Sequence, residues 1–86
     1  TARPNPFRGS TSFTVRLDRT AHLEVRILDT AGRVVRRLTA GSRAKGPHAF
    51  TWDGLADDDQ PVAAGTYFIR AESGDQHRTQ KVVLLR

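Results

Sequence analysis

The 86-residue sequence contains no cysteine, so neither a disulfide nor a thiolate metal site can form. No apolar run approaches the roughly 20 residues that a membrane-spanning helix requires. The sequence also lacks a Gly-x-Ser-x-Gly motif, a phosphate-binding glycine loop and any sustained helical repeat of apolar residues. These absences exclude thiol chemistry, a transmembrane helix and the common catalytic motifs, and we expect a protein without enzymatic activity or an organic cofactor.

The sequence does contain a series of short segments in which apolar and polar residues alternate. Phe13, Val15 and Leu17, for example, share one face of a segment whose other face is polar. A period of two is typical of strands that bury one face. Strands are predicted on this basis over residues 12–18, 22–29, 33–38, 48–53, 66–73 and 76–86. Residues 40–47, which are polar and contain two glycines, are predicted to form a flexible loop.

Short strands at intervals of roughly 8–12 residues, without helices, predict two packed sheets. Residues 1–86 are therefore predicted to form one all-β domain, an immunoglobulin-like β-sandwich of about seven antiparallel strands in two sheets. Residues 1–11 form a Pro-rich opening segment, predicted at a sheet edge because proline lacks a backbone donor, with Phe7 beneath the sandwich. Trp52 is predicted to be the largest core side chain. The last strand ends in an apolar run, 82–85, and is predicted to lie mid-sheet or beneath a partner.

Positive charge is concentrated in the first half of the chain, and the formal net charge is +5. Arginines that alternate with apolar residues are typical of a solvated sheet face. The alternative is a basic patch on one sheet face that binds anionic polysaccharide, lipid phosphates or a secretion receptor. Nucleic acid is not expected, because no aromatic residues are interleaved to stack bases. The arginines considered for this patch are Arg16, Arg26, Arg33, Arg36 and Arg37.

Four carboxylates lie within seven residues: Asp53, Asp57, Asp58 and Asp59. Ca²⁺ takes six to eight oxygen ligands, so this loop is a candidate Ca²⁺ site. The loop lacks the regular Asp-x-Asp-x-Asp-Gly spacing of a calcium-binding loop. The alternative is a solvated turn in which aspartates bond to nearby backbone amides.

Four stretches spread over most of the chain carry a family resemblance. They are residues 4–7 (Pro-Asn-Pro-Phe), 28–35, 52–54 (Trp-Asp-Gly) and 61–68. In this order and spacing they resemble two overlapping families: the Ig-like domain of the flagellar hook-capping protein and the C-terminal sorting domain of the type IX secretion system. Physical chemistry gives several of these residues a folding role in turns or in the core. They are Asp29, Gly32, Trp52, Asp53, Gly54, Gly65 and Tyr67, of which Tyr67 is expected to reach back to a loop carbonyl.

The resemblance implies a non-catalytic module at the C-terminus of a secreted, multi-domain protein, at the surface of a Gram-negative-type bacterium or outside it. The abrupt start at Thr1, without methionine, fits this expectation. The expected partners are outer-membrane secretion proteins or neighbouring domains of the parent protein, and the module is expected to be a monomer. The alternative is a structural, assembly or carbohydrate-contacting accessory domain. The sorting family implies that the recognised feature is the terminal strand, namely Lys81, Val82, Val83, Leu84, Leu85 and Arg86.

Overall fold

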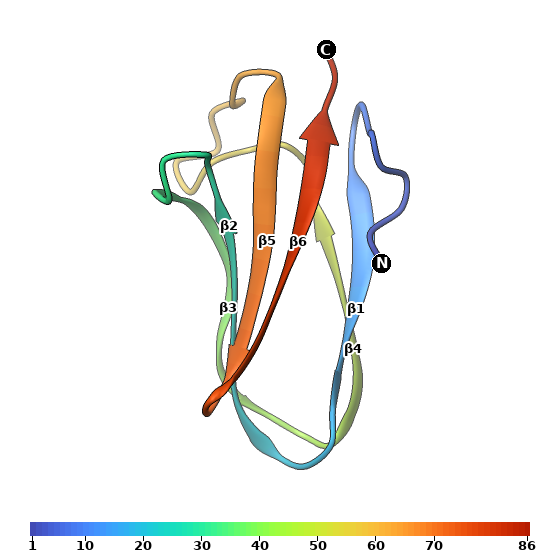
Figure 1. Cartoon of the computed structure of the whole chain (residues 1–86), viewed down its shortest axis with the longest axis vertical. Helices are drawn as coiled ribbons and strands as arrows, with labels where there is room; N and C mark the ends of the chain where they lie inside the picture. Colours follow the sequence, from blue (N-terminus) through green and yellow to red (C-terminus); the bar gives the residue numbers. More distant parts are fainter.

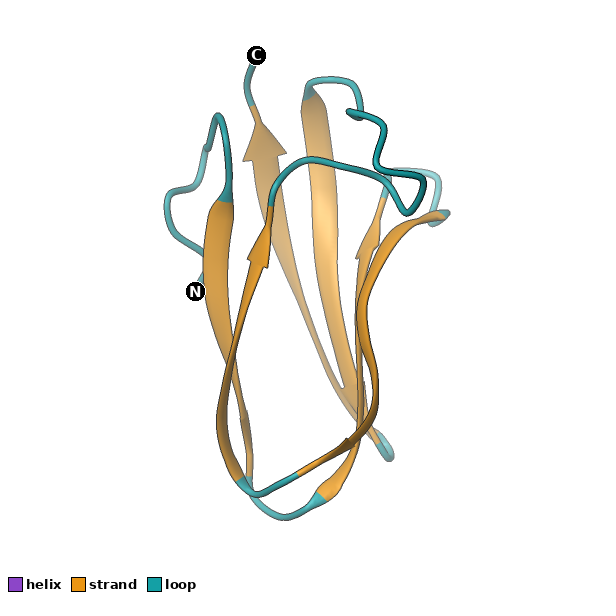
Figure 2. Cartoon of the chain, turned by 180° about the vertical axis from the view of Figure 1, so that it is seen from behind, coloured by secondary structure: helices purple, strands orange, loops and turns teal.

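The computed structural model describes all 86 residues and consists of strands, turns and loops, as Figure 2 shows. It contains no helix that is long and apolar enough to cross a membrane. The six strands are β1 (Thr11–Leu17), β2 (Ala21–Leu28), β3 (Val34–Arg43), β4 (Gly46–Trp52), β5 (Gly65–Ser73) and β6 (Gln76–Leu84).

The strands form two antiparallel sheets that face one another (Figure 1). One sheet has two strands, β1 and β4, and the other has four in the order β3-β2-β5-β6. The predicted all-β sandwich is therefore confirmed, with six strands in place of about seven. Residues 62 and 63 form no strand, and the opening segment pairs with the sheets only through isolated bridges at Arg3 and Phe7.

The core lies between the sheets and is built from the alternating apolar positions that the sequence predicted. Trp52 is the largest fully buried side chain, which confirms its predicted role. Its ring lies 5.6 Å from that of Phe7 and 5.2 Å from that of Tyr67, in tilted and edge-on geometry. Such aromatic pairs add about 0.5–1.5 kcal/mol each to the stabilisation from burial alone. Phe7 is buried beneath the sandwich, also as predicted.

The prediction of a flexible loop over residues 40–47 was wrong. β3 continues to Arg43 and β4 begins at Gly46, so only Ala44 and Lys45 connect them. The β2–β3 ladder extends from Leu28↔Val34 to Ala21↔Arg43, with two register shifts. Backbone pairing to β2 thus holds a polar, glycine-containing segment in a strand. Residues 40–43 (Ala-Gly-Ser-Arg) show no alternation of apolar and polar side chains, so the sequence pattern did not reveal this part of the strand.

The position predicted for the last strand also needs correction. β6 is an edge strand of the four-stranded sheet and does not lie mid-sheet. Its apolar end is instead covered by the opening segment, because Phe7 N–H donates to Val83 O (2.9 Å) and Leu85 N–H donates to Phe7 O (2.8 Å). The N-terminal segment of the same chain thus pairs with the C-terminal part of the β6 edge. Figure 1 shows the N-terminal segment beside the C-terminal end of β6.

Candidate functional site

The terminal strand alternates between the core and the surface. Val82 and Leu84 are buried, and Val83 is half-buried on the opposite face. Lys81, Leu85 and Arg86 are exposed. Leu85 is the one large hydrophobic residue of the chain that is exposed (38 %). The predicted recognition segment therefore combines two core anchors with a displayed surface of basic and apolar side chains.

Arg86 is held against the loop that follows β4. Its guanidinium donates to Val62 O (2.5 Å) and lies 3.5 Å from Gly54 O. Gly54 is buried with φ +76°, a left-handed conformation that favours glycine. A Cβ built on Gly54 would lie 3.5 Å from Leu84 Cδ2 and 3.7 Å from Arg86 Nη2. The backbone conformation therefore favours glycine at this position of the Trp-Asp-Gly motif, in a loop that packs against the end of the recognition segment.

The other two residues of that motif fix the same turn. The indole Nε1–H of Trp52 donates to Leu55 O (2.9 Å), and Leu55 N–H donates to Asp53 Oδ1 (3.2 Å). Trp52 thus anchors the motif in the core, while Asp53 accepts a backbone hydrogen bond that closes the turn. This arrangement sets where Gly54 O stands relative to Arg86.

Tyr67 closes the end of the same loop. Its hydroxyl donates to Ala63 O (2.6 Å), the contact that the sequence predicted. Burial raises the pKa of the Tyr67 hydroxyl above its ordinary value, and the negative charge of Asp29 acts in the same direction. The phenol therefore stays protonated at neutral pH and keeps its role as donor. Gly65, two residues earlier, begins β5 with φ +149°.

Asp29 organises the β2–β3 turn. Its Oδ1 accepts the backbone N–H of Ala31 and of Arg33, both at 2.9 Å, and its Oδ2 accepts Arg33 Nε–H (2.9 Å). The backbone donor of Arg33 contributes most to lowering the pKa of this carboxyl, followed by that of Ala31 and the Arg33 side chain. Gly32 supplies the φ of +84° that the turn needs.

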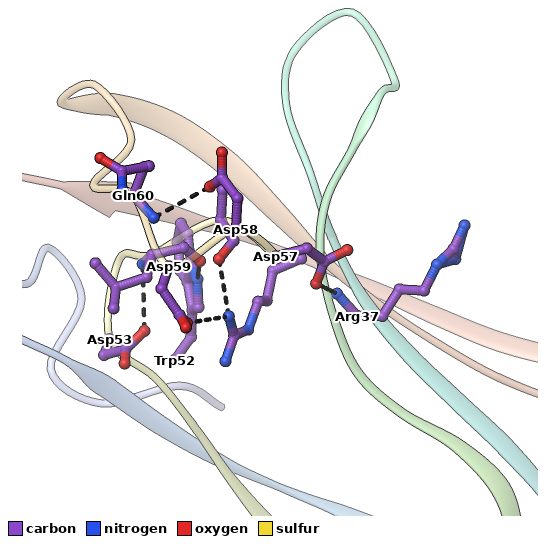
Figure 3. Close-up of polar contacts among 10 residues, drawn as sticks. Arg37, Trp52, Asp53, Asp57, Asp58, Asp59 and Gln60 are labelled. Atoms are coloured by element: carbon purple, nitrogen blue, oxygen red, sulfur yellow. Dashed lines mark hydrogen bonds and ion pairs between the residues drawn. The ribbon is translucent and has the colours of Figure 1, made fainter.

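The acidic loop does not gather its carboxylates into a common site. Figure 3 shows each aspartate directed to a different donor. Asp57 Oδ1 accepts Arg37 N–H (2.9 Å), Asp58 Oδ1 accepts Gln60 N–H (3.1 Å), and Asp59 Oδ1 lies 3.2 Å from Arg36 Nη1. No three His, Cys, Asp or Glu side chains are arranged to hold a metal ion. The contacts match the alternative of a turn closed by aspartates, and they tie the loop to β3.

The structure does not bring the five candidate arginines together on one sheet face. Arg16 lies on β1 in the two-stranded sheet, whereas Arg26, Arg36 and Arg37 lie on strands of the other sheet. Arg26 pairs with Glu72, whose pKa is lowered chiefly by a hydrogen bond from Arg70. Carboxylates also pair with Arg33 and Arg36. The five arginines considered for the alternative of a basic patch therefore do not share one sheet face.

Sequence reasoning missed Asn5 as a contact of the recognition segment. Its side-chain Nδ2–H donates to Lys81 O and its Oδ1 accepts Val83 N–H, both at 3.0 Å. Nearby, Ala2 N–H donates to Gln80 Oε1 (3.0 Å). The sequence feature that could have indicated this contact is the single Asn between two prolines. A segment with two prolines lacks the backbone donors for a complete strand ladder, so a side chain has to supply part of the pairing.

These features, an Ig-like sandwich with a Trp-Asp-Gly turn and a tyrosine-closed loop, define a class of small β-sandwich domain. The model of the FlgD Ig-like domain family matches residues 2–77, and the chain belongs to that family. The basal-body rod modification protein FlgD of Salmonella typhimurium is 43 % identical over 61 residues, which is 70 % of this chain. The chain covers 26 % of that relative's length.

Two solved structures from Porphyromonas gingivalis share the fold. One is PorZ, described as an essential bacterial surface component of the type-IX secretion system, with a TM-score of 0.72 and 18 % identity over all of this chain and 11 % of PorZ. The other is dimeric latent PorU, with a TM-score of 0.75 and 23 % identity over 99 % of this chain and 9 % of PorU. In both, the similarity covers a small part of a much larger protein.

Proposed function

We propose that this chain is a non-catalytic sorting or anchoring module of an exported bacterial protein, recognised through its terminal segment, residues 81–86, by an outer-membrane secretion machinery of the type IX kind. The cell surface or the surrounding medium is then the destination of the protein that carries it. Membership of the FlgD Ig-like family and the fold shared with a domain of the surface component PorZ support this proposal.

One observation carries the choice of the terminal segment. Leu85 is the one large hydrophobic residue whose side chain is exposed. In the sequence it lies between Lys81 and Arg86, which are also exposed. Val82 and Leu84, fixed in the core, hold the segment in one orientation. An apolar side chain that follows directly on a strand anchored in the core, with basic side chains near it in the sequence, is a surface that a partner can bind without unfolding the domain.

The test must separate recognition from folding. Deletion of residues 81–86 would remove two buried side chains at about 2–5 kcal/mol each, so lost delivery would also follow from unfolding. Lys81→Glu and Leu85→Ser change only exposed side chains. Lys45→Glu is the matched control, because Lys45 is the other lysine and lies exposed in the β3–β4 connection.

Each variant is fused to a reporter carrying a signal peptide and expressed in a bacterium with a type IX system. We expect the wild type and Lys45→Glu to reach the surface, and the Lys81→Glu/Leu85→Ser variant to remain in the periplasm with an unchanged melting temperature. Normal delivery of the folded double variant would refute the role of the segment. Failure of the wild-type fusion itself would refute the sorting function.

The second candidate function is an Ig-like assembly domain of an extracellular structure. Its support is the 43 % identity to FlgD, which is named for modification of the basal-body rod. An assembly domain would bind a structural subunit with or without Lys81 and Leu85 intact. Replacing the Ig-like region of the Salmonella protein with this chain and scoring motility discriminates the two: restored motility favours assembly, and loss of motility with a stable chimera favours sorting.

A further inference from the structure

The four-stranded sheet has an outer face, which points away from β1 and β4 (Figure 1). The buried residues of its strands point to the core, so the residues between them point outward. Phe68 on β5 is directly opposite Leu28 on β2, and Leu28 is directly opposite Val34 on β3. All three are half-buried. A solvated sheet face is ordinarily polar, so this apolar row across three strands departs from the usual pattern.

The apolar row continues onto the recognition segment. Lys81 on β6 is directly opposite Phe68, and Val83 lies two residues further along, diagonally to the same ring. The residues on either side of Val83 are buried, so Lys81 and Val83 point outward. Side chains at diagonal positions are about 7–8 Å apart, which is within reach of an aromatic ring. A partner that contacts Lys81 therefore meets Phe68 and Val83 on the same face.

A row of arginines borders the apolar row. Arg26 on β2 is directly opposite Arg37 on β3 and Arg70 on β5, and like charges in such pairs are destabilising. Glu72 compensates two of them, because it accepts hydrogen bonds from Arg26 and from Arg70 Nε (2.7 Å). Arg26 Nε is buried without a hydrogen-bond partner, and no carboxylate pairs with the side chain of Arg37. The row therefore retains uncompensated positive charge.

The carboxylates of this face lie farther from the apolar row than the arginines do. Glu24 and Glu72 are directly opposite each other, one row beyond the arginines as counted from Phe68. Asp57, at the edge of β3, accepts a backbone N–H there. Lys81, beside Phe68, forms no ion pair. The border nearest to the apolar row is thus positive.

This combination of shape and charge restricts what can bind. A second copy would bring the same arginine row and a formal net charge of +5, which opposes pairing of the two faces. A bilayer takes up apolar groups to a depth of about 5–10 Å, whereas Phe68 and Leu28 are half-buried in the sheet and cannot be inserted. A protein surface that projects an apolar side chain surrounded by carboxylates complements both the apolar row and its positive border.

We propose that the outer face is part of the surface that docks onto the secretion machinery, and that the contacting surface of that partner is acidic. An apolar side chain of the partner packs between Leu28 and Phe68, and a carboxylate faces Arg37. This inference rests on the sorting function proposed above, because the partner is the one that binds residues 81–86. It makes Phe68 and Arg37 specificity-determining residues outside the recognition segment.

The reporter assay described above tests this face with two single variants. Phe68→Thr removes the ring and keeps a β-branched residue in the strand, and Arg37→Glu reverses an exposed charge that has no ion pair. We expect each folded variant to lower the surface fraction at least about fivefold, equivalent to about 1 kcal/mol. Phe68→Leu keeps an apolar contact and is expected to retain delivery. Arg16→Glu, at an exposed and unpaired arginine on β1, is the control and is expected to be delivered normally.

A photo-cross-linker identifies what lies on the face. p-Benzoylphenylalanine replaces Phe68 in one fusion and Thr14, which is exposed on β1, in a control fusion. After irradiation of cells, mass spectrometry maps the cross-linked peptide. We expect position 68 to cross-link to an outer-membrane protein at a peptide that contains Asp or Glu, and position 14 to give no such product.

The outcomes separate this inference from the sorting function. Normal delivery of both Phe68→Thr and Arg37→Glu, with Lys81→Glu/Leu85→Ser still retained, would overturn the inference alone. Failure of the wild-type fusion would overturn both. No cross-link at position 68, or a cross-link to a second copy or to a peptide without a carboxylate, would also contradict an acidic partner. Binding to phosphatidylglycerol vesicles that is lost in Phe68→Thr would assign the face to a membrane instead.

Discussion

The side-chain amide of Asn5 occupies the place of a neighbouring strand's peptide group beside Val83. Val83 N–H donates to Asn5 Oδ1, while Asn5 Nδ2–H donates to Lys81 O, and both distances are 3.0 Å. Phe7 continues the pairing with two backbone hydrogen bonds. The N-terminal segment therefore pairs with the backbone of β6 along the recognition segment. A partner of the folded domain would contact the side chains of residues 81–86 there and not their backbone.

The first prediction concerns this amide. Asn5→Asp keeps the acceptor and loses the donor, which leaves Lys81 O facing a carboxylate. We expect the free energy of unfolding to fall by about 1–2 kcal/mol, the range for one lost hydrogen bond with an unsatisfied partner. Urea denaturation followed by Trp52 fluorescence measures it. Gln76→Ala, at an exposed residue whose side chain forms no hydrogen bond, is the control and is expected to change stability by less than about 0.5 kcal/mol. An equal loss in both variants would contradict the role of Asn5.

The second prediction compares two glycines. Gly54→Ala places a Cβ at φ +76° against Leu84 and Arg86, and we expect a cost of about 1–3 kcal/mol from the strained backbone. Gly41 has open space around it and no positive φ. Gly41→Ala is therefore expected to be neutral or slightly stabilising. Thermal melts of the two variants measure the difference, and similar melting temperatures would show that the loop adapts to a side chain at Gly54.

The third prediction is a dependence of stability on pH. The folded state lowers the pKa of Asp29 and of Glu72, so the contribution of each carboxylate is present above its unfolded pKa and is lost as the pH falls through its folded pKa. Stability is expected to decline on acidification below about pH 5. Asp29→Asn removes one of the two carboxylates and is expected to flatten the decline. Asp75→Asn, at an exposed carboxylate outside the ion pairs, is the control. Parallel pH profiles for wild type and Asp29→Asn would contradict this account.

The fourth prediction concerns the acidic loop. Because Asp57, Asp58 and Asp59 are each directed to a different donor, Ca²⁺ would have to displace those contacts before it could gather the carboxylates. We expect no shift in melting temperature on addition of Ca²⁺ or a chelator, and no heat in calorimetric titration. A saturable, Ca²⁺-dependent rise in melting temperature, lost in Asp58→Asn, would restore the loop as a metal site.

The sequence predicted the parts of this structure that depend on local alternation and on turn chemistry. Phe13 and Leu17 face the core because strands that bury one face have a period of two. Asp29 and Tyr67 make the contacts expected of them because the partners of each lie within four residues in the sequence. Local geometry and residue type were sufficient at these positions.

Features that depend on distant pairing were not predictable in the same way. The end of β3, from Thr39 to Arg43, is held by pairing with β2, and its own residues show no alternation of apolar and polar side chains. Asn5 and Val83 are 78 residues apart, so their contact appears only once the two sheets are closed. The distribution of the candidate arginines over two sheets was unpredictable for the same reason, because alternation along a strand gives the face on which a residue lies and not the sheet to which its strand belongs.

The central claim is that the terminal segment of the folded domain is read by an outer-membrane secretion machinery. Its most direct test is the surface fraction of a signal-peptide-bearing reporter fused to the wild type, to Lys45→Glu and to Lys81→Glu/Leu85→Ser, measured with the melting temperature of each domain. The account predicts that all three domains stay folded and that only the double variant is retained in the periplasm. Surface delivery of the double variant at the wild-type level would contradict it.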